Sequence, residues 1–127
     1  MWCRGIRGAT TVPENTKEAI LAASKELLQN MIEANQVGIS DIACILFTTT
    51  PDLNAAFPAA AARELGWTQV PLLCGHEMNV TGSLSRCLRI LVLFNTNKGI
   101  EEIVSVYLRG TEILRDDEKS WQDESKK

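Results

Sequence analysis

The sequence predicts an α+β fold of two layers, with one long helix covering one face of a mixed sheet of about five strands. One amphipathic segment has the length of about five helical turns, and it is the only long one. Several short apolar runs have strand length and are separated by Gly, Pro and polar residues. The 127 residues fit one domain, without an internal repeat or linker.

The chain opens with a predicted strand at residues 2–9, which runs into a loop at Thr10–Pro13. Asn15 followed by Glu18 predicts a helix start through a capping box. The helix is expected to end near Asn35–Gly38. Its apolar face consists of Ile20, Ser24, Leu27, Leu28, Met31 and Ile32.

The rest of the chain supplies the other strands and a short helical segment. Ile42–Thr48 is a continuous apolar run, which predicts a central strand buried on both faces. Residues 116–127 are almost wholly polar and are predicted to be a mobile tail after a domain at 1–115. The remaining predicted elements are a helical segment at Ala59–Leu65 stopped by Gly66, a strand at Val70–Cys74, a polar loop at residues 75–79, a strand at Cys87–Phe94, a helical turn at Gly99–Ile103 and a last strand at Val104–Leu114.

Composition and charge argue against several classes of function. A net charge of −3 and a pI of about 5.2 give no basic surplus for binding nucleic acid. No apolar run approaches the ~18–20 residues that cross a bilayer. Arg4 and Arg7 stand where a signal peptide needs its apolar region, so we expect a cytoplasmic protein.

The cysteines and the single histidine argue against a metal site. Cys3, Cys44, Cys74 and Cys87 are scattered, with no C-x-x-C pair, and His76 is the only histidine. We therefore expect no metal. Cys3, Cys44 and Cys87 lie in apolar segments, where small core residues are expected.

A two-layer sheet leaves its second face open. Exposure of that face to water would be unfavourable for strands as apolar as Ile42–Phe47 and Leu88–Phe94. A small chain can bury such a face by association, so we expect a homo-oligomer, whose subunit number this pattern leaves open.

The arginines concentrate in or beside the predicted sheet, whereas the lysines lie on the helix, in a loop and in the tail. Arginine holds carboxylates through two parallel hydrogen bonds. Arg89 shares a strand face with apolar Leu91 and Leu93, so it either pairs with a glutamate or marks a site, and the pattern leaves both readings open. Several arginines with Glu77 and Tyr107 could converge on a small anion, while His76 has no nucleophile tied to it by a motif.

Seven motifs, in order and in register from residue 4 to about 115, give the chain a strong resemblance to a known family. The motifs are RGIRGATTV at Arg4–Val12, TPDL at Thr50–Leu53, AFPA at Ala56–Ala59, REL at Arg63–Leu65, VTG at Val80–Gly82, CLR at Cys87–Arg89 and VYL at Val106–Leu108. With these motifs the chain resembles the monofunctional bacterial chorismate mutases of the trimeric type.

The resemblance implies a trimeric pseudo-barrel with active sites in the clefts between subunits. It implies an isomerase that converts chorismate to prephenate in the shikimate pathway of aromatic amino acid biosynthesis, by a concerted Claisen-type rearrangement without a cofactor. Arg89, Glu77 and Arg7 correspond to its catalytic residues. The substrate-binding residues implied by the resemblance are Arg7, Leu73 (through its backbone), Cys74, Glu77, Arg89, Tyr107, Phe57, Arg63 and Arg115.

The chain departs from the family pattern at four places, which include Leu73 in place of an expected polar residue and a run at Leu65–Trp67 that is one residue shorter than usual. Ala59–Ala62 are all alanine where the resemblance predicts a lysine, which makes the cleft entrance less positive. Gly75–His76 is also atypical. Two alternatives remain: an imine deaminase on a similar trimeric scaffold, and a non-catalytic module that binds a metabolite.

Overall fold

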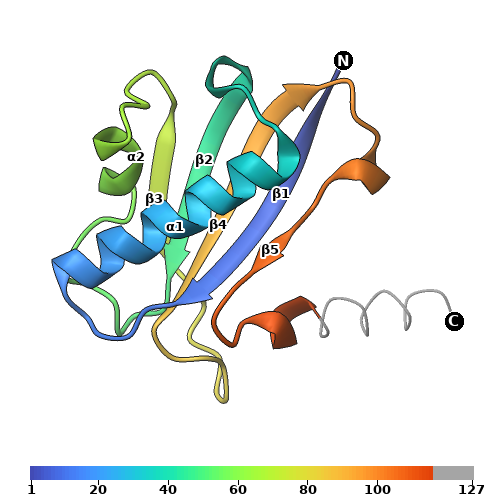
Figure 1. The fold of residues 1–127 in the computed structure, drawn as a ribbon. Helices are drawn as coiled ribbons and strands as arrows, with labels where there is room; N and C mark the ends of the chain where they lie inside the picture. Colours follow the sequence, from blue (N-terminus) through green and yellow to red (C-terminus); the bar gives the residue numbers. More distant parts are fainter. Residues whose placement is uncertain (116–127) are drawn as a thin grey trace, which may run out of the picture.

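The computed structural model describes residues 1–115, which form one sheet and a small set of helices (Figure 1). The predicted mobile tail at 116–127 lies outside the described residues. In chain order the elements are β1 (Trp2–Thr11), α1 (Lys17–Asn35), the 3₁₀ turn η1 (Ile39–Asp41), β2 (Ile42–Thr49), α2 (Ala60–Glu64), β3 (Leu72–His76), β4 (Cys87–Thr96), the 3₁₀ turn η2 (Ile100–Glu102) and β5 (Val106–Tyr107).

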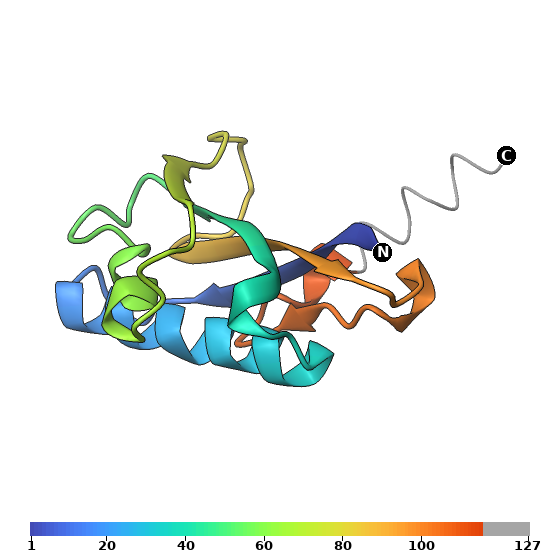
Figure 2. The same cartoon turned by 90° about the horizontal axis from the view of Figure 1, so that it is seen from above.

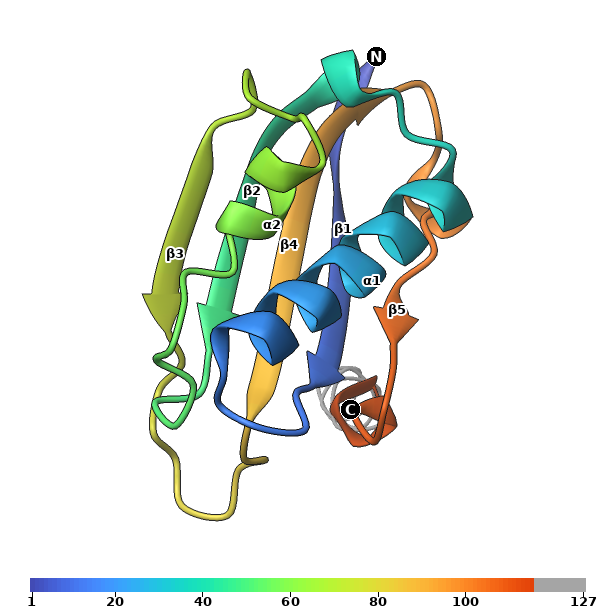
Figure 3. The same cartoon turned by 60° about the vertical axis from the view of Figure 1, so that its left-hand side comes forward.

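The sheet has five strands in the order β3-β2-β4-β1-β5, as Figure 3 shows. β4 runs antiparallel to both of its neighbours, β1 and β2. The outer strands are parallel to the strands they join, β3 to β2 and β5 to β1. The sheet is therefore mixed, and the predicted α+β class is confirmed.

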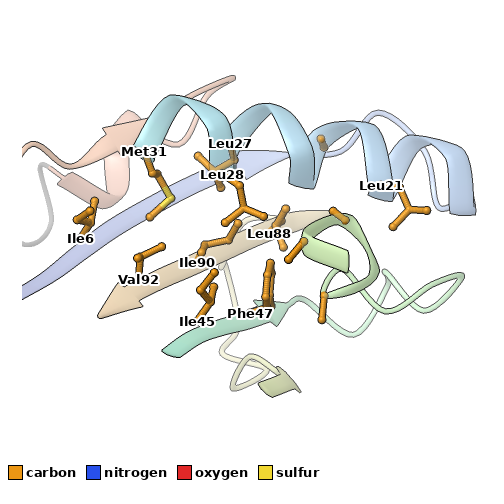
Figure 4. Close-up of a cluster of buried hydrophobic side chains, with 14 of the residues drawn as sticks. Ile6, Leu21, Leu27, Leu28, Met31, Ile45, Phe47, Leu88, Ile90 and Val92 are labelled. Carbon is orange, nitrogen blue, oxygen red and sulfur yellow. The ribbon is translucent and has the colours of Figure 1, made fainter. Parts of the chain in front are cut away.

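Both helices lie on the same face of the sheet, which makes the two predicted layers (Figure 2). The core fills the space between α1 and the central strands, where Leu27, Leu28, Ile45 and Val92 are fully buried (Figure 4). Each such side chain contributes roughly 1.5–3 kcal/mol by leaving water. Ser24 fits on this apolar face because its hydroxyl donates to Ile20 O at 2.7 Å.

β1 and α1 approach each other closely at Gly8. A Cβ placed there would overlap the Sδ of Met31, which is fully buried. The absence of a side chain at residue 8 therefore sets how closely the helix packs on the sheet.

The helix begins one residue later than the capping box predicts. Thr16 is the N-cap, and its hydroxyl oxygen accepts from the Ala19 amide at 3.1 Å. Asn15, the predicted cap, instead accepts from the amides of Asn54 and Ala55, both at 3.0 Å. The prediction of Asn15 was wrong because a long-range contact uses that side chain.

Several strands differ from the prediction in their limits. β1 continues to Thr11, into the predicted loop, and β4 continues to Thr96. β3 runs from Leu72 to His76, so Gly75 and His76 are strand residues rather than loop. The last strand, predicted over Val104–Leu114, contains only Val106–Tyr107. The side chain of Asn35 hydrogen-bonds both the amide and the carbonyl of Val104, so Val104 does not pair with a strand. Arg109, with φ 50°, turns the chain, and a helical turn follows at 112–115.

The central strands are buried on one face only in the single chain. Along β4, Leu88, Ile90, Val92 and Phe94 are buried, whereas the alternating residues from Arg89 to Leu93 are half-buried. β2 shows the same alternation, which corrects the prediction of burial on both faces. We call the half-buried side, opposite α1 and α2, the open face.

Among the three cysteines predicted as core residues, only Cys87 is buried. Cys3 is exposed and Cys44 is half-buried. Both pair with residues of β4 that lie on the open face, Cys3 with Asn95 and Cys44 with Leu93. Cys3 and Cys44 therefore lie on the open face, which the helices do not cover, and this is why they are not in the core.

Candidate active site

A pocket of about 260 Å³ lies on the open face of the sheet. Side chains from five segments line it: β1, β2, the start of the β3–β4 loop, β4 and β5. The lining residues are Arg7, Gly8, Leu46, Thr48, Glu77, Arg89, Ile90, Leu91 and Tyr107.

The strand register explains why the two arginines meet. Arg7 pairs with Leu91, and Ala9, two residues on, pairs with Arg89. Because side chains two residues apart on a strand share a face, Arg7 and Arg89 are diagonal neighbours on adjacent strands. Two guanidinium groups therefore flank one hollow.

Glu77 supplies the negative charge of the pocket. The Thr48 hydroxyl donates to Glu77 Oε1 at 2.6 Å, and Arg89 Nη1 lies 3.4 Å from the same oxygen. The Glu77 amide also donates to Thr49 O at 2.8 Å, which extends the β2–β3 pairing into the loop. The carboxylate is thus fixed by its backbone and by two side chains.

Of the two readings of Arg89, the pair with a glutamate is confirmed, and the functional site stays a prediction. Arg89 has a glutamate partner, and the pair itself lines the pocket. Its side chain keeps 41% of its surface exposed. Cys87, two residues earlier, has a thiol whose pKa burial raises to about 11, so it stays neutral beside the site.

Tyr107 enters the pocket from the sheet's edge. Its strand, β5, joins β1 by the pairs Gly8–Val106 and Ala9–Tyr107. The guanidinium carbon of Arg115 lies 4.9 Å from the centre of the Tyr107 ring, a cation–π contact. Arg115 therefore reaches the site through Tyr107.

The remaining predicted residues lie outside this pocket. Phe57 and Cys74 line another pocket of about 380 Å³ with His76. Arg63, near the end of α2, lines a third of about 270 Å³. Leu73 points from β3 with 64% of its surface exposed. In one chain the predicted site is therefore split into two groups.

Cys74 is poorly suited to act as a nucleophile here. Burial raises the pKa of its thiol, although the backbone at Ala59 and the charge of Arg63 oppose this. A neutral thiol is a weak hydrogen-bond donor rather than a nucleophile or a metal ligand.

Thr48 is a pocket residue that sequence reasoning missed. Threonine is common in strands, so its type alone gives no signal. Its place in the alternation of β2, on the face opposite the buried Ile45, Phe47 and Thr49, was the only available clue.

Two further properties concern residues 1–115 as a whole. They contain no group of three His, Cys, Asp or Glu side chains arranged to hold a metal ion. In the same range no helix has both the length and the apolar character needed to cross a membrane.

Comparison with known proteins gives consistent results. The family model described as chorismate mutase type I matches residues 3–118. Chorismate mutase AroH of Bacillus subtilis (strain 168) is 47% identical over 118 residues, which cover 92% of this chain and 93% of that protein. Chorismate mutase AroH of Thermus thermophilus is 49% identical over 120 residues, covering 94% and 98%.

A solved structure has the same fold. The chorismate mutase from Clostridium thermocellum superposes with a TM-score of 0.85 at 47% identity, covering 89% of this chain and 99% of that one. The matches do not support the deaminase or the non-catalytic binding module as alternatives.

Proposed function

The chain belongs to the chorismate mutase type I family and isomerises chorismate to prephenate, and we propose that it does so in the pocket lined by Arg7, Glu77 and Arg89. The observation that carries this proposal is the convergence of two guanidinium groups and a fixed carboxylate on one hollow. A dianion with a hydroxyl group needs both kinds of partner. The step belongs to aromatic amino acid biosynthesis.

The reaction is an intramolecular rearrangement, in which the ether C–O bond of chorismate breaks as a new C–C bond forms. No atom enters or leaves, and no proton transfer is required. The protein therefore has two tasks: to hold the flexible dianion in its compact reactive conformer, and to stabilise the charge that separates in the transition state. Because the substrate supplies every bond that changes, we propose that the enzyme needs no cofactor or metal.

We assign each task to particular side chains. Arg89 donates to the ether oxygen, where negative charge grows as the bond breaks. Arg7 and Tyr107 bind a carboxylate of the substrate, and Arg115 lies on the outer side of the Tyr107 ring. Glu77 accepts from the ring hydroxyl.

We propose that a neighbouring subunit supplies the second wall of the site, in a homotrimer. Phe57, Arg63, Leu73 and Cys74 lie outside the pocket of their own chain. The open face also leaves Leu91 and Leu93 half-covered, which favours association through that side. In the assembled site the Leu73 backbone and the Cys74 thiol would approach the ring hydroxyl together with Glu77.

The domain limits and the location in the cell are also proposals. We propose that residues 1–115 form the catalytic domain and that the enzyme works in the cytoplasm. The motifs and the pocket residues fall within 1–115.

A spectrophotometric assay tests the function directly. Purified protein without added metal or cofactor is expected to remove the absorbance of chorismate and to yield prephenate. Calorimetric binding of chorismate without turnover would instead indicate a non-catalytic module.

Arg89→Ala tests the assigned site. Because the contact strengthens only in the transition state, kcat is expected to fall by about 10²–10³-fold while KM changes much less. Steady-state kinetics measure both constants. An equal fall of kcat in His76→Gln would point to acid–base chemistry and contradict the assignment.

A further inference from the structure

β5 is too short to fix its own position. It has two residues and lies at the edge of the sheet, with β1 as its neighbour. Two pairs of parallel strand residues give little stability on their own. This strand carries Tyr107 into the pocket, and the segments on either side of β5 make further contacts that hold the strand.

Upstream of Tyr107, the side chain of Asn35 holds the backbone of Val104. Asn35 Nδ2 donates to Val104 O at 2.9 Å, and Asn35 Oδ1 accepts from Val104 N at 2.7 Å. The same Nδ2 donates to Met31 O at 2.9 Å, and Asn35 is fully buried. The amide therefore acts as a strand partner supplied by the last residue of α1.

Downstream, Glu26 of α1 holds Arg109. Its Oε2 lies 2.8 Å from Arg109 Nη2, and its Oε1 accepts from Nη2 at 3.1 Å and from Nε at 3.2 Å. Hydrogen bonding to Glu26 raises the pKa of Arg109. The carbonyl of Arg109 also accepts from the Thr11 hydroxyl at 2.8 Å, which fixes the turn that follows β5.

The two anchors are separated by similar distances along α1 and along the segment that contains β5. Nine residues of helix between Glu26 and Asn35 span about 13 Å, and five residues between Val104 and Arg109 span at most about 17 Å. Figure 3 shows α1 crossing the sheet with β5 alongside. One rigid helix can thus hold both flanks of the strand at once.

From this geometry we propose that Glu26 and Asn35 are positioning residues, which hold Tyr107 in the active site through Arg109 and Val104. The inference rests on the proposed function, because it assumes that Tyr107 binds the substrate. An exposed ion pair such as Glu26–Arg109 contributes little to folding stability. Its effect is therefore expected in the placement of Tyr107 rather than in the melting temperature.

The chain offers a selective probe, because Tyr107 is its only tyrosine. Protein labelled with 3-fluorotyrosine gives one ¹⁹F resonance, which reports on this ring alone. Glu26→Gln removes the charge of the pair. Arg109→Asn removes the guanidinium but keeps a residue that tolerates the left-handed backbone at φ 50°.

Both variants are expected to shift or broaden the Tyr107 resonance and to lower kcat/KM by about two- to fivefold, mainly through KM. The double variant should be no worse than either single one, since both changes break the same contact. The matched control is Lys25→Met, also on α1, which removes the 3.3 Å pair between Lys25 and Glu64 of α2. The control should leave the resonance and kcat/KM unchanged.

An unchanged resonance with unchanged kcat/KM in both variants would overturn the inference, as would an equal effect of Lys25→Met. Asn35→Asp tests the upstream flank, and if it fails to fold, the Glu26–Arg109 variants still decide. Two measurements on otherwise wild-type protein separate this failure from failure of the proposed function. Chorismate should shift the Tyr107 resonance, and Tyr107→Phe should weaken substrate binding.

Discussion

At the scale of single residues, the Glu77 carboxylate is held on one oxygen by groups from two strands. Thr48 on β2 and Arg89 on β4 both contact Oε1. These two contacts fix the position of the carboxylate in the pocket. Arg89 could be predicted as a candidate because a charge on an apolar strand face is costly unless it has a partner. The threonine could not, since it is an ordinary strand residue.

Thr48→Val tests this arrangement with almost no change of shape. It removes the hydroxyl that donates to Glu77, and a hydrogen bond to a charged group contributes roughly 1.5–3 kcal/mol. We expect kcat/KM to fall about tenfold. Thr48→Ser keeps the donor and should retain most of the activity; an equal loss in both variants would point to packing instead.

Asp52 controls a different local contact, at the start of β4. Its carboxylate accepts from the Thr50 hydroxyl at 2.5 Å and from the Arg86 amide at 2.9 Å. The hydrogen bond from Thr50 is the main cause that lowers the pKa of Asp52 below 3.8, and desolvation opposes it. The turn thereby fixes Arg86, three residues before Arg89.

The lowered pKa of Asp52 has a consequence for stability against pH. A carboxyl group whose folded-state pKa is depressed stabilises the fold above its unfolded pKa and loses that contribution as pH falls through the folded value. The unfolding free energy of the wild type should therefore exceed that of Asp52→Asn from pH 7 down to about pH 5. The difference should shrink below about pH 4, measured by urea denaturation. A difference that stays constant to pH 2 would contradict this role.

At the scale of elements, α1 was predictable and β5 was not. The period of 3.6 residues along α1 is a local signal, so its existence and length followed from the sequence. β5 is limited by Asn35, which is 69 residues away from Val104 in the chain, and such a contact leaves no mark on local alternation. The cap moved from Asn15 to Thr16 for the same kind of reason, because Asn15 binds the backbone of Asn54.

The packing of α1 on β1 can be tested at Gly8. In Gly8→Ala the new methyl group would meet the side chain of Met31, which is buried in the core. Overpacking of this kind costs about 1–3 kcal/mol, so the melting temperature should fall. Gly75→Ala is the control, because a Cβ at residue 75 meets no atom within 4 Å. Equal stability of the two variants would show that the helix shifts freely.

At the scale of the whole molecule, the order of strands in the sheet explains why the predicted site residues fall into two groups. The sequence motifs predicted members of both groups, since they follow the family order. Sequence spacing could not show that Phe57 and Arg63 lie away from Arg89 in one chain. That separation depends on the order of strands in the sheet, which places β3 and α2 toward one edge and β5 at the other.

Mixed oligomers test whether two subunits share each site. Arg89→Ala and Arg63→Ala are each expected to lower activity alone. If the residues act from different subunits of a trimer, mixing the two variants under exchange conditions should restore roughly a quarter of the sites. Activity after mixing and re-isolation gives the answer. Absence of any recovery, with exchange confirmed by mass spectrometry, would mean that one chain supplies both residues.

The strand order also governs how the chain can fold. β1 pairs along its whole length with β4, so that Trp2 meets Thr96, and its other neighbour is β5. During synthesis the first strand must wait for the last third of the polypeptide before either of its edges is satisfied. The chain loses conformational entropy when this long loop closes, before strand pairing stabilises it. This order of events favours slow folding. While only the N-terminal half has been synthesised, both edges of β1 are therefore unpaired. At that stage the nascent chain is most exposed to pairing with other chains.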